Sequence, residues 1–264
     1  MYLKRKADAY LNAWKSDPNR SPLIIKGPRQ VGKTETIDYF AAHNYRSVVE
    51  INFVEEPKYR AITADGYGAN TIVRNISLID PAKKFIPGDT LIFFDEIQAH
   101  PDIVTALKFF KIDGKYDVIC SGSMLGISYK QIESNSVGYK TDYEMRSLDF
   151  EEFLWARGYD EAVIESMFTH LCDATPFSEV EMNVFSTAFM DYCVLGGMPA
   201  VVASHIRTGT FEGTLQLQRQ LILDYQEDIR KYAQGLDQAR ILNVFNHIPV
   251  QLAKENKKFQ ISKV

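Results

Sequence analysis

The chain has 264 residues, of which 45% are hydrophobic and 24% carry a charged side chain, and its formal net charge at pH 7 is −4. This composition is typical of a soluble globular protein with one large domain or two smaller ones, and it excludes an intrinsically disordered chain. Nucleic-acid binders usually carry a basic surface, so the negative balance argues against direct contact between this region and nucleic acid.

The N-terminal sequence and the cysteines indicate the compartment. The chain begins MYLKRKADAYLNAW, a charged amphipathic pattern that lacks the apolar core of a signal peptide. No run reaches the roughly eighteen apolar residues that a membrane span requires. The three cysteines (Cys120, Cys172 and Cys193) lie far apart, which favours a reducing compartment over a disulfide framework. We therefore expect a cytoplasmic protein without a membrane segment.

Short apolar runs alternate with helical patterns in the first half of the chain. Runs at residues 23–25, 48–51, 91–94 and 118–120 predict strands, and three of them are nearly unbroken, as in a parallel sheet covered by helices on both faces. From about Phe150 the periodicity is helical. Residues 211–233 predict an amphipathic helix whose packed face carries Leu215, Ile222, Tyr225, Ile229 and Tyr232. The sequence therefore predicts an α/β domain over residues 1–148, followed by a helical lid domain over residues 149–264.

The segment after the first predicted strand matches the phosphate-binding pattern G-x-x-x-x-G-K-[ST]. With the acid that follows, it comprises Gly27, Pro28, Arg29, Gln30, Val31, Gly32, Lys33, Thr34 and Glu35. Glycines let the backbone curl so that its N–H groups and the next helix N-terminus surround phosphate oxygens. Lys33 adds positive charge near the β- and γ-phosphates, and Thr34 offers a hydroxyl to Mg²⁺. A chance glycine-rich turn is the alternative, but the strand–loop–helix setting favours a P-loop that binds a nucleoside triphosphate.

Two acids, Asp95 and Glu96, end the apolar strand at residues 91–94. In P-loop ATPases the aspartate at this position holds Mg²⁺, commonly through water, so we assign that role to Asp95. Glu96 points to the other side of the strand and is placed to activate the attacking water as general base. The strand could instead end in solvated acids, but the upstream P-loop favours the catalytic interpretation.

The sequence also limits which nucleotide base is bound and which molecule accepts the phosphoryl group. A GTPase normally carries an [NT]-K-x-D motif, and the nearest sequence, residues 110–113, has phenylalanine where asparagine or threonine belongs. The adjacent acids at residues 95–96 indicate water as acceptor, in contrast to a small-molecule kinase. The residues therefore predict a nucleoside triphosphate hydrolase without guanine specificity.

Further segments have no generic chemical role but occur together in a fixed order: SGSMLG, SLDFEEFL, GGMPAVV and QLAKENKKF. With GPRQVGKT and LIFFDEIQ they resemble a family of prokaryotic AAA+-like ATPases, related to STAND-type proteins, that have a C-terminal domain of unknown function. The resemblance covers essentially the whole chain and implies ATP as nucleotide and Mg²⁺ as metal. Because family members usually continue into a further domain with nuclease-like features, we expect most of that domain to lie outside this chain, and we assign no nuclease activity to its residues.

The resemblance implies roles for two further positions. In many AAA+-like enzymes a small polar residue at the end of the neighbouring strand senses the γ-phosphate; Ser121 and Ser123 are candidates, and Ser123 is favoured because Gly122 lets it turn. In STAND-type relatives the proline of a G-x-P motif lies against the base, which implies that Pro199 touches adenine. The alternatives are a plain Ser-Gly turn and a helix-breaking turn. Arg29 has two candidate partners, a phosphate and a neighbouring acid.

We therefore predict an ATP-binding protein that hydrolyses ATP with Mg²⁺ and changes conformation as it does so. Two alternatives stay open: a nucleotide-gated STAND-like switch with little turnover, and the ATPase part of a DNA-associated nuclease. The expected partners are ATP or ADP, together with a homo-oligomer or another protein. In a ring, a neighbouring subunit would supply an arginine, for which Arg146, Arg157 and Arg207 are candidates.

Overall fold

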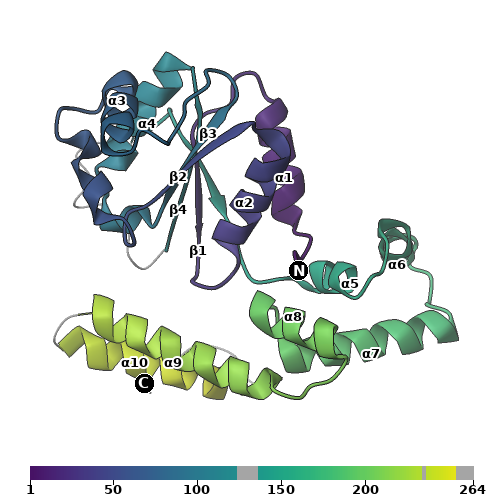
Figure 1. Ribbon diagram of the computed structural model, residues 1–264. Coiled ribbons are helices and arrows are strands. Elements are labelled where there is room, and N and C mark those ends of the chain that lie inside the picture. The colour runs from purple at the N-terminus through teal and green to yellow at the C-terminus, as the bar shows by residue number, and fades with distance from the viewer. Residues whose placement is uncertain (124–135, 234–235, 254–264) are drawn as a thin grey trace. The chain divides into compact units, whose positions relative to one another are not determined.

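The computed structural model describes residues 1–123, 136–233 and 236–253 (Figure 1). Contacts between residues divide the chain into two units, Met1–Thr210 and Phe211–Val264.

A parallel sheet of five strands forms the centre of the first unit. Its strands are β1 (Leu23–Gly27), β2 (Ser47–Asn52), β3 (Thr90–Asp95), β4 (Asp117–Ser123) and β5 (Thr141–Glu144), arranged in the order β2-β3-β4-β1-β5. The four strands predicted from apolar runs are confirmed, whereas β5 was not predicted. Gly27 pairs with Ser123 and Asn52 pairs with Asp95, so these residues lie at the carboxyl ends of their strands. Ligands of open α/β sheets bind at this edge.

Helices cover both faces of the sheet, as the unbroken apolar strands predicted. Helices α1 (Lys6–Ser16) and α2 (Lys33–Asn44) lie on one face, and α3 (Ala69–Ile79) and α4 (Ile103–Asp113) lie on the other (Figure 1). The short 3₁₀ segments η1 (Pro57–Thr63) and η2 (Ile97–Ala99) complete this part. In β3, Leu91 and Phe93 join the core beneath α1 and α2, while Ile92 and Phe94 join the opposite core. Successive side chains of a strand point to opposite faces, so β3 supplies both cores.

Four helices follow the sheet within the first unit: α5 (Phe150–Ala156), α6 (Glu161–Asp173), α7 (Glu179–Leu195) and α8 (Pro199–Thr208). Asp149, Asp160 and Ser178 cap the first three, each accepting a hydrogen bond from the backbone N–H three residues on. Such caps satisfy N–H groups that have no partner within the helix. The predicted domain boundary at residue 148 coincides with the start of these helices, but it stays a prediction.

In the second unit the structure describes α9 (Thr214–Tyr232) and α10 (Leu236–Leu252). The predicted helix is present and Ile229 is buried, but Leu215 and Ile222 are exposed and Leu221 is buried. Among the helices that the structure describes, none combines the length and the hydropathy that a membrane span would need.

Candidate nucleotide site

The P-loop runs from the end of β1 to the start of α2, and each of its glycines meets a different constraint. Gly32 adopts φ of 89°, in the left-handed region, where a side chain is disfavoured. At Gly27, an added Cβ would lie 2.1 Å from the carbonyl oxygen of Met145. The N–H of Met145 donates to the Lys26 carbonyl at 2.7 Å, which explains this close approach. Position 27 therefore requires glycine also because the backbone that leaves β5 passes so close to it. The sequence alone did not reveal this second reason.

Lys33 is the first residue of α2 and lies inside the curl of the loop. Its Nζ donates to the carbonyl oxygens of Gly27 at 3.1 Å and Pro28 at 2.7 Å. Burial lowers the pKa of Lys33, and the nearby carboxylates of Glu96 and Asp95 act in the opposite direction. A triphosphate in the loop would compete with the two carbonyls for this ammonium group.

Asp95 is 4% exposed and is oriented from three sides. Its Oδ2 accepts a hydrogen bond from Thr34 Oγ1 at 3.2 Å and lies 3.4 Å from Asn52 Nδ2, and its Oδ1 accepts from the hydroxyl of Ser121. The structure thus brings the two predicted magnesium residues, Thr34 and Asp95, together. Ser121 contacts this aspartate, and the sensing of a phosphate by Ser121 or Ser123 stays a prediction.

The oxygens of Thr34 and Asp95 suit Mg²⁺, a hard cation that retains water and binds phosphate oxygens. In the part of the chain that the structure describes, no group of three histidine, cysteine or acidic side chains could hold a metal ion alone. The site therefore fits a magnesium ion whose remaining ligands come from a nucleotide and from water.

Glu96 follows β3 with φ of 54°, a left-handed conformation uncommon for a residue with a side chain. The side-chain amide of Gln98 donates to the Glu96 carboxylate, and Gln98 Oε1 accepts from the backbone N–H of Ser123 at 3.3 Å. Gln98 therefore links the predicted base to the end of β4. Sequence reasoning missed this residue, although it closes the segment LIFFDEIQ. The rest of the segment SGSMLG, residues 124–126, lies outside the described residues.

Pro199 begins α8 and lies beside the P-loop, since a Cβ added to Gly32 would stand 3.7 Å from Pro199 Cγ. The preceding Gly197 accepts a hydrogen bond from the N–H of Leu148 at 2.7 Å. A Cβ on Gly197 would lie 2.0 Å from the Leu148 carbonyl oxygen, so this position requires glycine. The segment Gly197–Pro199 thus joins the P-loop to the chain before α5, and contact of Pro199 with adenine stays a prediction.

Comparison with known proteins agrees with this geometry. The family model of an AAA domain matches residues 19–154, more than half of the chain. The chain belongs to this AAA domain family. A second model, for a domain of unknown function (DUF8612), matches residues 186–264.

No curated protein matches the chain. Among solved structures, PCH-2 from C. elegans is similar with a TM-score of 0.37 and 10% identity; the match covers 98% of this chain and 64% of PCH-2. A RuvB variant from Thermotoga maritima is similar with a TM-score of 0.35 and 16% identity, over 57% of this chain and 46% of RuvB. The chain thus covers less than two thirds of the length of PCH-2 and of RuvB.

The remaining predicted residues of the AAA domain site lie on the loop and on the first turn of α2. Pro28, Gln30 and Glu35 are exposed, and Arg29 is half-buried. Val31 is buried, and its carbonyl oxygen accepts from Arg5 Nη1 at 2.8 Å. Arg5 is a second residue that sequence reasoning missed, because a single arginine in an amphipathic segment carries no recognisable signal.

Proposed function

We propose that this AAA domain protein binds ATP with Mg²⁺ at the P-loop, hydrolyses it, and moves helices α5–α8 in response. The observation that carries the proposal is the hydrogen bond of Thr34 to Asp95 beside Lys33, because these three groups match the needs of a magnesium-bound triphosphate. The AAA domain family match supports the same class of function.

In the proposed reaction, Lys33 binds the β- and γ-phosphates, and the loop N–H groups bind the oxygens around them. Asp95, oriented by Ser121 and Asn52, holds the metal with Thr34. Magnesium, when bound, supplies positive charge that offsets the charge on the phosphate oxygens. Glu96 orients the attacking water and accepts its proton.

Binding experiments test this proposal directly. Calorimetric titration with ATP and with GTP, each with and without magnesium, should show magnesium-dependent binding of ATP and weaker binding of GTP. Equal affinity for both nucleotides would contradict the adenine preference, and failure to bind either would contradict the proposal as a whole.

Thr34→Val should raise the magnesium concentration required for half-maximal turnover by about tenfold or more, because one oxygen ligand and its charge-assisted hydrogen bond are lost. Valine keeps the shape of threonine but cannot donate to the buried carboxylate of Asp95, so the free energy of unfolding of the nucleotide-free protein should also fall, by about 1–3 kcal/mol. Thr36→Val, a buried position one residue past Glu35 in the same helix, is the matched control. An unchanged magnesium requirement in Thr34→Val would remove Thr34 from the metal site.

Gln98→Ala should lower kcat by about tenfold and leave KM nearly unchanged. The Gln98 amide holds the Glu96 carboxylate, so its loss lets the base sample unproductive positions without touching the phosphates. Steady-state kinetics separate the two constants. A rise in KM at constant kcat would show instead that Gln98 contributes to nucleotide binding.

A nucleotide-gated switch with little turnover is the second candidate. The position of Pro199 favours it, because this first residue of α8 lies beside Gly32 of the P-loop, where an added Cβ would stand 3.7 Å from Pro199 Cγ. Such a switch retains nucleotide through purification, which chromatography of the denatured protein would detect. Nucleotide-free protein that turns over ATP rapidly would exclude the switch.

Assembly into a homo-oligomer is part of the same proposal. Of the three candidate arginines, Arg146 pairs with Glu144 at 3.1 Å and has a largely exposed side chain, Arg157 pairs with Asp191, and Arg207 is exposed. An arginine supplied by a neighbouring subunit would make turnover per subunit rise with protein concentration.

A further inference from the structure

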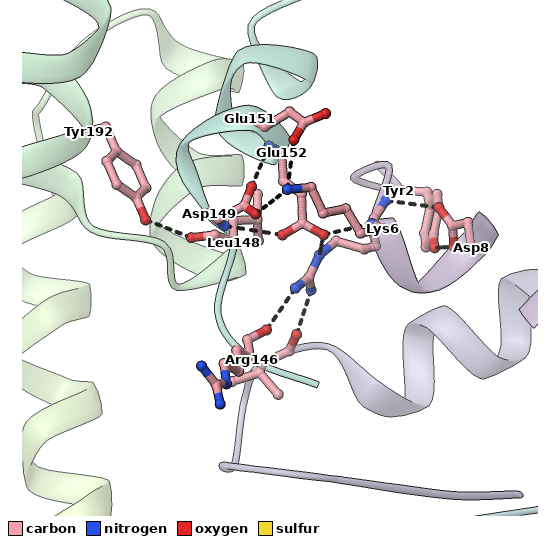
Figure 2. A network of polar contacts seen from close by, with 11 residues as sticks. Tyr2, Lys6, Asp8, Arg146, Leu148, Asp149, Glu151, Glu152 and Tyr192 are labelled. Carbon is pink, nitrogen blue, oxygen red and sulfur yellow. Dashed lines mark hydrogen bonds and ion pairs between the residues drawn. The ribbon is translucent and has the colours of Figure 1, made fainter. Parts of the chain in front are cut away.

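Arg5 is a buried side chain beside the P-loop that the predicted reaction does not use. Only 4% of its surface is exposed. Its guanidinium donates to three separate parts of the chain: the carbonyl of Val31 at 2.8 Å, the carbonyl of Arg146 at 2.7 Å, and the carboxylate of Glu152 at 3.2 Å (Figure 2). One planar group thus connects the P-loop, the segment after β5, and helix α5.

The carboxylate of Glu152 is itself held in place, so the guanidinium has little freedom to move. Glu152 accepts from the backbone N–H of Lys6 at 2.7 Å and from that of Asp149 at 3.1 Å (Figure 2). It is also 5% exposed. Since arginine is a rigid fork whose bonds have fixed directions, a shift of the Val31 carbonyl must either move this network or break a bond to it.

A second series of contacts leads from the segment that contains Arg146 back to the P-loop. Two residues beyond Arg146, Leu148 donates its N–H to the Gly197 carbonyl. The carbonyl of Leu148 accepts from Tyr192 at 2.8 Å (Figure 2). Two residues beyond Gly197, Pro199 lies near Gly32, where an added Cβ would stand 3.7 Å from Pro199 Cγ and 3.6 Å from Arg5 Nη1. The start of α5 is therefore hydrogen-bonded to the P-loop through Arg5, and the start of α8 lies beside the loop.

We propose that Arg5 is a positioning residue that couples the P-loop to helices α5 and α8, so that nucleotide bound in the loop changes the stability of the lid. The inference rests on the proposed nucleotide binding. Lys33 donates to two loop carbonyls, and a phosphate would compete with these carbonyls for the ammonium group. Val31, whose carbonyl accepts from Arg5, lies between those carbonyls and Gly32 in the same loop. A change in the loop reaches the Val31 carbonyl first and the guanidinium next.

Hydrogen–deuterium exchange with and without ADP and magnesium tests the coupling. In the parent protein, nucleotide should slow exchange about tenfold or more both in the P-loop and in α8. In Arg5→Lys, the charge opposite Glu152 is kept but one amine cannot reach all three acceptors. Nucleotide at saturation should then protect the P-loop and leave exchange in α8 unchanged.

Lys6→Ala is the matched control. Lys6 is the adjacent cation and also pairs with acids of the α5 region, Asp149 at 2.5 Å and Glu151 at 2.6 Å, but its pairs are half exposed and do not involve the P-loop. In Lys6→Ala, the effect of nucleotide on hydrogen–deuterium exchange should match that in the parent. The double variant Arg5→Gln, Glu152→Gln removes both charges together and avoids an unpaired buried ion, so it should fold and show the same loss of coupling.

The outcomes separate this inference from the proposed function. If nucleotide protects α8 in Arg5→Lys and in the double variant as strongly as in the parent, the coupling is overturned and the proposed nucleotide binding stands. Absence of any nucleotide effect on the P-loop of the parent overturns the proposed function and the coupling with it. Loss of α8 protection in both Arg5 variants, with the P-loop still protected and the Lys6→Ala pattern normal, supports the coupling.

Discussion

Lys33→Ala is expected to raise the Kd for ATP with magnesium by about 100-fold or more, which corresponds to about 2.7 kcal/mol. The ammonium lies within the loop, and burial has already removed much of its water, so its bonds to phosphate would be charge-assisted and poorly screened. Calorimetric titration of the variant and the parent measures the change. Alanine is a good helix former, so α2 should still begin at this residue.

Lys26→Ala provides the comparison. Lys26 precedes the loop by one residue but pairs with Asp142 of β5 at 2.8 Å, away from the phosphate-binding N–H groups. Its affinity for ATP should stay within about twofold of the parent value. Equal affinities in Lys33→Ala and in the parent would show that the phosphates do not lie where the P-loop pattern places them.

Glu96→Gln is expected to lower kcat by about 10²–10⁴-fold while the Kd for ATP changes little, because general acid–base catalysis is lost and the phosphate-binding groups are untouched. Glutamine has the size of glutamate, so the left-handed turn and its packing should persist. Single-turnover phosphate release, with binding measured in parallel, separates the two effects.

Glu50→Gln is the matched control for this variant. Glu50 is an acid of β2 whose side chain reaches solvent but is partly desolvated. This partial desolvation first, and then the negative charges of Asp38 and Asp95, raise the pKa of Glu50. Its turnover should stay within a few-fold of the parent value. If Glu96→Gln retained full turnover, Glu96 could not be the base.

The sheet and the phosphate loop could be predicted because their signals are local. Strands β1, β3 and β4 are buried on both faces and therefore read as unbroken apolar runs. By contrast, β5 has the sequence TDYE and lies at the edge of the sheet with mostly exposed side chains, so no apolar run marks it. In α9 the predicted packing of Ile229 is confirmed, whereas that of Ile222 is wrong, because the adjacent Leu221 is also apolar and is the residue that is buried.

The parts of the site that could not be predicted depend on contacts between distant segments. Arg5 and Glu152 are 147 residues apart in the sequence, and no motif spacing connects them. The segments SLDFEEFL and GGMPAVV were recognisable only by resemblance. The structure gives them a physical reason, because Leu148 pairs with Gly197 and Glu152 receives Arg5. Gln98 was missed for the same reason, since its partner Ser123 ends a different strand.

Phosphate release from ATP with magnesium tests the central claim most directly, measured for the parent, Lys33→Ala and Glu96→Gln at several protein concentrations. The account predicts turnover by the parent, its loss in both variants, and ATP binding that persists only in Glu96→Gln. Turnover in Lys33→Ala equal to that of the parent would contradict the assignment of the P-loop as the site of hydrolysis.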